Sequence, residues 1–213
     1  MLSTRLKRKL KENESLTEDF RIRLHRAISW LGCAEKQDSE LDFKFLSLWI
    51  SFNSCYAIDL KEKNQRSEKE KFKNFISSLV NNDHENRISN LLWNKFSGPI
   101  RMLISNPYVF NIYWDYLRGE RLEWEYAHKV SINAAMKYLA SNNTVGLLEI
   151  ILDRLYVLRN QIMHGGATYK SKVNRNQIVD GTRILEMLIP IIIDIMLQNP
   201  DEDWGRILYP VVK

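Results

Sequence analysis

Apolar side chains recur at intervals of three and four residues along most of the chain, and this spacing constrains the fold more than any other feature. The clearest run consists of Leu148, Ile151, Leu155, Leu158 and Ile162. Because an α-helix turns once in about 3.6 residues, these positions share one face and form a packing seam. Gly165 and Gly166 follow the run, as is typical just beyond a helix C-terminus. No stretch alternates with the two-residue period of a strand, so the predicted class is all-α.

The same spacing predicts further helices before this run. Ser15 and Glu18 match a capping box, in which side chains satisfy the backbone N–H groups that open a helix. The next helix is expected to begin at Asp38 or Ser39, and it is apolar around much of its circumference, which favours a central position in the core. A third helix is expected over 67–80.

Residues 83–141 predict several shorter helices, with breaks near 97–99, 106–107 and 118–119, where Gly or Pro interrupts the pattern. The region is rich in aromatic residues, namely Phe110, Tyr113, Trp114, Tyr116, Trp124 and Tyr126. An aromatic face can stack nucleobases. A helical core or a subunit seam is the commoner use of such residues, and both interpretations stay open.

The C-terminal part predicts one more helix over 174–197, with a kink or break at Pro190 because proline cannot donate the internal hydrogen bond. Residues 199–213 are then expected to form a packed coil around Trp204.

Composition limits the class of protein. A chain of 213 residues with 45% hydrophobic residues can bury a sizeable core in a single domain. The net charge of +5 permits an anionic partner without requiring one. Cys33 and Cys55 lack metal-ligand spacing and predict buried, unreactive thiols in a reducing compartment. With no signal-peptide pattern and no apolar stretch long enough to cross a bilayer, we expect a soluble cytoplasmic protein with no membrane partner.

The residues that carry chemistry lie at the end of the clearest helix. Arg159, Asn160 and His164 combine a permanent cation, a polar amide and an imidazole. Asn160 and His164 are four residues apart and therefore neighbours on one ridge, which Tyr156 continues. A guanidinium can hold two phosphate oxygens at once, and an imidazole can move protons near neutral pH. The set can therefore bind a phosphodiester and transfer protons without a metal or a cofactor.

A basic loop follows this helix. Lys170, Lys172 and Arg175 are placed to track a nucleic-acid backbone, since phosphate contacts supply much of the affinity of such complexes. The alternative is a plain basic connector.

A second Arg–His pair, Arg121 and His128, has a weaker context. Leu122 stands where a polar residue would be needed, and aromatic residues interrupt the segment. We interpret this pair as part of a structural helix in which His128 faces solvent or is hydrogen-bonded.

The remaining titratable candidates have plainer explanations. Glu149 and Asp153 are four residues apart and could hold a divalent cation, but they lack a histidine partner, so an exposed acidic edge is predicted. His25 and His84 stand alone in charged surroundings, which predicts surface positions. No metal site is expected.

The pattern Arg159-Asn160 with His164 resembles the signature of the HEPN superfamily. A segment of the second helix is also similar to Apea-like and uncharacterised HEPN proteins, namely Leu48-Trp49-Ile50-Ser51-Phe52-Asn53-Ser54. The resemblance implies one domain over 1–213, with a four-helix up-down core. This core would occupy 16–62 and 145–198, with a helical insertion at 67–141 and a tail at 199–213.

The resemblance also implies an activity. Two protomers would pair so that both Arg159 and His164 sets face one cleft. His164 would act as general acid or base while the RNA 2′-hydroxyl attacks the adjacent phosphate. Arg159 would stabilise the developing charge, and Asn160 would orient the imidazole or the phosphate. Such a homodimeric, metal-independent endoribonuclease would leave a 2′,3′-cyclic phosphate and would fit toxin–antitoxin or phage-defence and stress roles.

The chain departs from part of the family at one position. Some HEPN toxins carry a tyrosine two residues after the histidine, which a partner enzyme modifies, whereas this chain has Gly166 there. Neutralisation by that kind of antitoxin is therefore in doubt.

Two alternatives to catalysis stay open. One is a non-catalytic module that binds RNA or a protein partner through the same cleft. The other is a helical scaffold in which Arg159 and His164 are structural, with a salt bridge to Asp153 or a contact to a carbonyl group.

Overall fold

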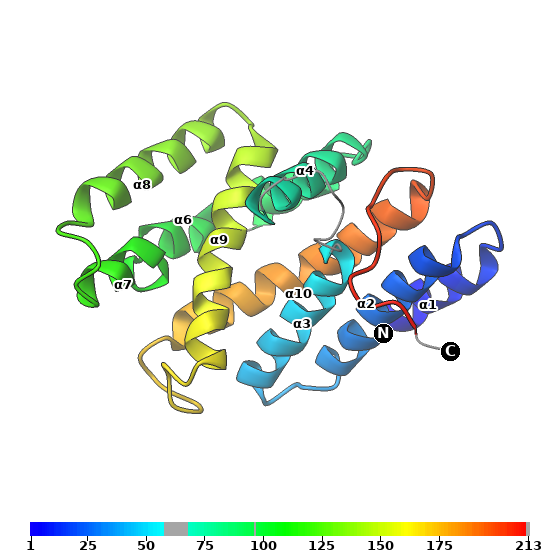
Figure 1. The fold of residues 1–213 in the computed structure, drawn as a ribbon, viewed down its shortest axis with the longest axis horizontal. Helices are drawn as coiled ribbons and strands as arrows, with labels where there is room; N and C mark the ends of the chain where they lie inside the picture. The colour runs from blue at the N-terminus through cyan, green and yellow to red at the C-terminus, as the bar shows by residue number, and fades with distance from the viewer. Residues whose placement is uncertain (58–67, 96, 212–213) are drawn as a thin grey trace. The chain divides into compact units, whose positions relative to one another are not determined.

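The computed structural model describes residues 1–57, 68–95 and 97–211 (Figure 1). Within these ranges every regular element is a helix and no strand forms, which confirms the all-α class. The chain divides into two compact units, Met1–Glu85 with Leu185–Lys213 and Asn86–Ile184. The four-helix HEPN-like core with its helical insertion stays a prediction. None of the described helices is both long and apolar enough to span a bilayer.

Unit 1 is a layer of helices around an apolar core. Its elements are α1 (Leu2–Glu12), α2 (Glu18–Ala34), α3 (Leu41–Tyr56), α4 (Glu68–Asn81) and the second part of α10 (Arg175–Gln198). Helix α2 packs against both α1 and α3, as Figure 1 shows in blue and cyan. Ion pairs tie α10 to this layer, with Lys9 Nζ 2.6 Å from Asp194 Oδ1 and Lys44 Nζ 2.7 Å from Glu186 Oε1.

Helix α1 was not predicted from the sequence. Its segment is dominated by basic residues, yet Leu6 and Leu10 are buried. The carboxylate of Glu35 accepts hydrogen bonds from the backbone N–H groups of Leu2 (2.6 Å) and Ser3 (3.2 Å). A distant side chain thus satisfies the open N-terminus of the helix, which local capping patterns cannot reveal.

The start predicted for α2 from the sequence is wrong by a few residues. Thr17, and not Ser15, caps α2, because Thr17 Oγ1 accepts a hydrogen bond of 3.4 Å from the N–H group of Phe20. The hydroxyl of Ser15 instead donates to Asn13 Oδ1 at 2.7 Å. Helix α3 begins at Leu41, two residues after Ser39. The expected start of α4 at residue 67 lies outside the described residues.

The C-terminal segment packs around Trp204, as predicted. This indole is 4% exposed, and its N–H group donates to the carbonyl of Asn199 at 2.9 Å. Arg23 of α2 holds the segment in place: its guanidinium donates to the carbonyls of Cys55 (2.8 Å), Trp204 (2.7 Å) and Gly205 (2.7 Å). Three backbone acceptors from two distant segments therefore converge on one buried cation.

The two thiols differ in environment. Cys55 is fully buried, and burial raises the pKa of its thiol to about 12, which keeps it protonated. Cys33 is only half-buried, and its sulfur lies 3.7 Å from Ser47 Oγ. The prediction of buried thiols is therefore confirmed for Cys55 and wrong for Cys33.

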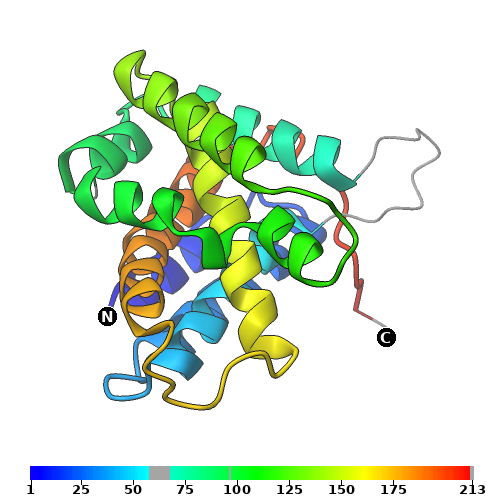
Figure 2. The same ribbon diagram turned by 90° about the vertical axis from the view of Figure 1, so that its left-hand side faces the viewer.

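Unit 2 is built on α9 (Thr144–Met163). The other elements are α5 (Arg87–Asn90), the π-helical turn η1 (Leu91–Lys95), α6 (Ser97–Ser105), the 3₁₀ turn η2 (Pro107–Val109), α7 (Asn111–Leu117) and α8 (Glu125–Ala140). Both α6 and α8 pack on α9, and in Figure 2 the yellow-green α8 crosses the upper part of the yellow α9 obliquely. The predicted seam is confirmed, with four of its members fully buried, namely Leu148, Ile151, Leu155 and Leu158. Ile162 at its end is half-buried.

The predicted breaks have mixed outcomes. The chain does leave helical geometry at Asn106, and Gly119 adopts a positive φ of 76° just after α7. The break near 97–99 is also confirmed, because η1 ends at Lys95 and α6 begins at Ser97, with Pro99 in its first turn, where no backbone N–H group is needed. A break at Pro190 is wrong, because α10 continues through this residue.

Candidate active site at the end of α9

Helix α9 ends in a hydrogen-bond pattern that fixes the backbone around His164. The N–H group of Gly165 donates to the carbonyl of Ile162 (3.3 Å), and that of Gly166 donates to the carbonyl of Gln161 (2.7 Å). Gly165 has φ of 71°, the left-handed conformation that this Schellman motif requires. His164 therefore caps the C-terminus of the helix, directly after Met163.

Of the three predicted catalytic side chains, the structure joins those of Arg159 and Asn160. Arg159 Nη1 donates to Asn160 Oδ1 at 2.8 Å, whereas His164 contacts Asn160 through the backbone alone, its main-chain N–H group donating to the carbonyl of Asn160 at 2.9 Å. An offset of five residues puts Arg159 and His164 about 140° apart around the helix axis. The bond to Asn160 draws the guanidinium toward the ridge that ends at His164.

Accessibility also suits a ligand at this place. Arg159 and Asn160 are half-buried, whereas His164 is exposed. Among the described residues, the imidazole of His164 has no hydrogen-bond partner, and the guanidinium of Arg159 uses only Nη1. Since a guanidinium has five N–H donors, most of those of Arg159 can still bind an anion.

Gln161 plays a part that sequence reasoning missed. Its side-chain amide N–H group donates to the carbonyl of Tyr108, and its Oε1 accepts from Asn174 Nδ2 at 2.6 Å. One side chain thus joins the end of α9 to η2 and to the start of α10. The only signal in the sequence is a polar residue three positions before His164, which also puts Gln161 beside it on the helix surface.

The predicted RNA-binding residues lie on the surface loop that follows. Lys170 and Lys172 are exposed, and Arg175 is half-buried. Arg175 Nε donates to the carbonyl of Ser171 at 3.3 Å, and the ammonium of Lys170 lies 5.1 Å from the ring centroid of Tyr169. The loop therefore presents positive charge close in sequence to His164. No hydrogen bond joins Lys170, Lys172 or Arg175 to Arg159 or Asn160.

The second Arg–His pair is separated, as the structural interpretation expects. Arg121 is exposed and lies 3.7 Å from Asp115, whereas His128 is 8% exposed and stacks against Phe110 at 5.1 Å between centroids. Burial lowers the pKa of His128, and the neighbouring charge of Arg154 lowers it further, while a hydrogen bond to the backbone of Ile104 acts in the opposite direction. His128 does not face solvent, and its Nε2 is buried without a hydrogen-bond partner among the described residues.

The predictions for the remaining titratable residues are confirmed for the two histidines and only partly for the two acidic residues. His25 and His84 are exposed, as predicted. Glu149 does not form an exposed edge with Asp153, because it is half-buried and its Oε1 is shielded from solvent without a hydrogen-bond partner. Asp153 is exposed and lies 3.2 Å from Nη1 of Arg154. In the described part of the chain, no three His, Cys, Asp or Glu side chains gather in a possible metal site.

The aromatic residues of the middle region form a cluster of their own. Tyr113 packs edge-on against Tyr108 at 5.5 Å, Trp114 at 5.7 Å and Trp124 at 4.9 Å between centroids. Phe110 is buried, whereas Tyr116 and Tyr126 are exposed. The cluster is thus partly core and partly surface.

Taken together, the end of α9 offers an exposed imidazole, a guanidinium with unused donors and an amide that holds this guanidinium. This set can bind an oxyanion and exchange protons with it. Comparison of the chain with family models, with curated proteins and with solved structures finds no significant match, so the assignment of a function depends on the site alone.

Proposed function

We propose that the protein is a metal-independent endoribonuclease of the HEPN type. The observation that carries this proposal is the Arg159–Asn160 hydrogen bond of 2.8 Å, one turn before the exposed imidazole of His164. This hydrogen bond holds the guanidinium of Arg159 at the same accessible helix end as the imidazole. The helix end therefore carries both a cation and a proton-transfer group. Phosphodiester cleavage by transesterification needs these two functions.

In the proposed reaction the ribose 2′-oxygen attacks the adjacent phosphorus. A bond forms between the 2′-oxygen and phosphorus, and the bond from phosphorus to the 5′-oxygen breaks. One group accepts the 2′-hydroxyl proton and another gives a proton to the departing 5′-oxygen. Arg159 stabilises the negative charge on the non-bridging oxygens, and Asn160 keeps its guanidinium in position. The products are a 2′,3′-cyclic phosphate and a 5′-hydroxyl.

This chemistry favours a homodimer. Each chain supplies one imidazole at the site, His164, whereas the reaction needs both a proton acceptor and a proton donor. Two copies that face one cleft supply both. The exposed Lys170 and Lys172, with Arg175, would then hold the RNA backbone on either side. We place the enzyme among defence or stress ribonucleases of the cytoplasm, with a neutralising protein as a further partner.

A non-catalytic RNA- or protein-binding module is the second candidate. The exposed basic loop favours it, because such a loop binds phosphate whether or not the imidazole is catalytic. In that case, neutralising Lys170 and Lys172 weakens RNA retention while no cleavage is seen in any variant.

The decisive experiment measures cleavage of an end-labelled RNA by the purified protein in EDTA. We expect His164→Ala and Arg159→Ala each to lower the cleavage rate at least about a hundredfold, the usual scale for losing a proton-transfer group. An RNA with a single 2′-deoxy substitution at the cut site should resist, because the attacking oxygen is missing. The products should carry a 2′,3′-cyclic phosphate.

Matched controls separate catalysis from folding. His25→Ala and Arg121→Ala remove an exposed histidine and an exposed arginine elsewhere, and both should cleave like the parent protein. Helical content is compared by circular dichroism. Undiminished cleavage by His164→Ala, or complete inhibition by EDTA, would refute the mechanism.

A further inference from the structure

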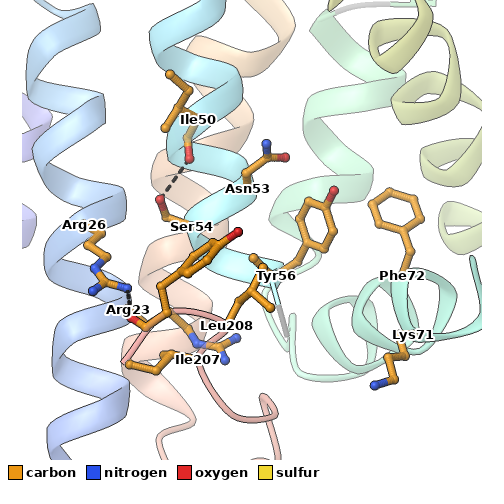
Figure 3. A pocket seen from close by; sticks show the side chains of 12 residues that line it. Arg23, Arg26, Ile50, Asn53, Ser54, Tyr56, Lys71, Phe72, Ile207 and Leu208 are labelled. Atoms are coloured by element: carbon orange, nitrogen blue, oxygen red, sulfur yellow. Dashed lines mark hydrogen bonds between the residues drawn. The ribbon is translucent and has the colours of Figure 1, made fainter. Parts of the chain in front are cut away.

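Unit 1 contains a pocket of about 420 Å³, far larger than a packing defect and within the usual size range of small-molecule sites. Its walls come from α2, α3, α4 and the C-terminal segment around residues 207–209 (Figure 3). Arg159 and His164 belong to unit 2, so the proposed nuclease site makes no use of this pocket.

The pocket is positively charged. Arg26 of α2 lies on one side and Lys71 of α4 on the opposite side, as Figure 3 shows. Arg26 Nη1 donates to the carbonyl of Tyr209 at 2.7 Å, and this guanidinium makes no other hydrogen bond or ion pair with the described residues. Its other N–H groups can therefore bind a carboxylate or a phosphate in the paired geometry that arginine favours. None of the described residues that line the pocket is acidic.

Aromatic rings supply the rest of the lining. Tyr56 and Phe72 pack edge-on at 5.2 Å between centroids and form one wall, while Tyr209 is 73% exposed at the mouth. Flat apolar walls next to a cation suit a ligand with an aromatic ring and a negative charge.

We propose that this pocket binds a small aromatic anion. Arg26 binds the anionic group, and Tyr56 and Phe72 contact the ring. The anionic group is a phosphate in a mononucleotide or a carboxylate in an aromatic acid.

Isothermal titration calorimetry on the full chain tests the proposal with two probes, adenosine 5′-monophosphate and indole-3-acetate. We expect at least one to bind with one site per chain. For adenosine 5′-monophosphate, the uncharged adenosine should bind about tenfold more weakly, because it lacks the group that Arg26 binds. For indole-3-acetate, the uncharged indole-3-acetamide should show the same loss.

Variants assign the contacts. Arg26→Gln should remove the preference for the charged probe over its neutral counterpart, with Arg8→Gln on exposed α1 as the matched control. Phe72→Ala should weaken the binding of the charged probe and of its neutral counterpart alike, because it removes part of the aromatic wall, with exposed Tyr126→Ala as the control. If one variant fails to fold, as judged by circular dichroism, the other still decides.

Several results would overturn the proposal. The absence of saturable binding by both probes is one, and unchanged binding in both Arg26→Gln and Phe72→Ala is another. Loss of binding in His164→Ala would assign the probe to the end of α9 instead. Because the nuclease assay and this titration use different variants, either idea can fail while the other stands.

Discussion

Among the described residues, each unit contains one arginine whose side chain is only 1% exposed. The hydrogen-bond partners of these two guanidinium groups differ. Arg23 in unit 1 donates to three backbone carbonyls. Arg154 in unit 2 donates to Ser131 Oγ at 2.7 Å and to the exposed Asp153 at 3.2 Å, and its Cζ lies 4.5 Å from the ring centroid of Phe110. Its Nε is buried without a partner. Burial lowers the pKa of both guanidinium groups.

This difference indicates a separate role for each buried arginine. Arg23 is a structural crosslink, because the carbonyls of Cys55, Trp204 and Gly205 come from segments far apart in the sequence. Arg154 is incompletely satisfied and lies close enough to His128 to disfavour its protonation. Unit 1 thus uses its buried charge for stability, whereas unit 2 carries a charge that makes it sensitive to pH.

The largest expected effect is the loss of the crosslink. Arg23→Met leaves three carbonyls without their donor, and each such loss costs about 1–3 kcal/mol. We expect the free energy of unfolding to fall by about 3–5 kcal/mol, measured by urea denaturation. Arg8→Met, at an exposed position, should change it by less than about 0.5 kcal/mol. An equally mild effect at both positions would contradict the crosslink.

Arg154→Met should cost less, about 1–2 kcal/mol in the same measurement. The substitution removes the bond to Ser131 and the contact with Phe110, but it also removes a buried cation whose Nε has no partner, and methionine fills the volume. A loss as large as that of Arg23→Met would show that the two sites do not differ.

The pH dependence of stability sharpens the same contrast. Burial depresses the pKa of His128 below its ordinary value of 6.5, and the charge of Arg154 depresses it further. The unfolded chain therefore takes up a proton first as the pH falls, so the contribution of His128 is complete above pH 6.5 and is lost toward the folded pKa. Calorimetry between pH 8 and 5 should show the parent losing stability faster than His128→Gln below about pH 6.5. Parallel curves would exclude this role.

The smallest expected effects are at the helix caps. Asn143 Oδ1 accepts from Gly146 at 2.9 Å in unit 2, whereas Thr17 Oγ1 accepts from Phe20 at 3.4 Å in unit 1. Asn143→Ala should lower the free energy of unfolding by about 1 kcal/mol and Thr17→Ala by about 0.5 kcal/mol. Asn143→Asp keeps the acceptor and should be nearly neutral. The reverse order would mean that hydrogen-bond length does not rank the two caps.

Features that depend on neighbours in the sequence were predictable. The buried face of α9 follows from its periodicity, and its end follows from Gly165. The link from Arg159 to Asn160 also joins adjacent residues, so the motif alone could suggest it. Local chemistry was ambiguous only where two candidates competed, as Ser15 and Thr17 did for the cap of α2.

Features that depend on distant contacts were not predictable. Helix α1 exists because Glu35 satisfies its N-terminus, and the sequence of α1 alone shows only a basic segment. Gln161 contacts Tyr108 and Asn174, and only the folded chain brings these residues together. The position of His128 beside Arg154 is a tertiary contact of the same kind.

The discontinuity of unit 1 has a consequence for synthesis on the ribosome. Arg23 emerges early, but two of its three carbonyl acceptors belong to Trp204 and Gly205, which follow after the whole of unit 2. Unit 2 is continuous and can close while translation proceeds, whereas the N-terminal helices must wait for their C-terminal partners. During that interval the apolar faces of α2 and α3 remain unprotected, which makes nascent unit 1 the part of the protein most in need of a chaperone.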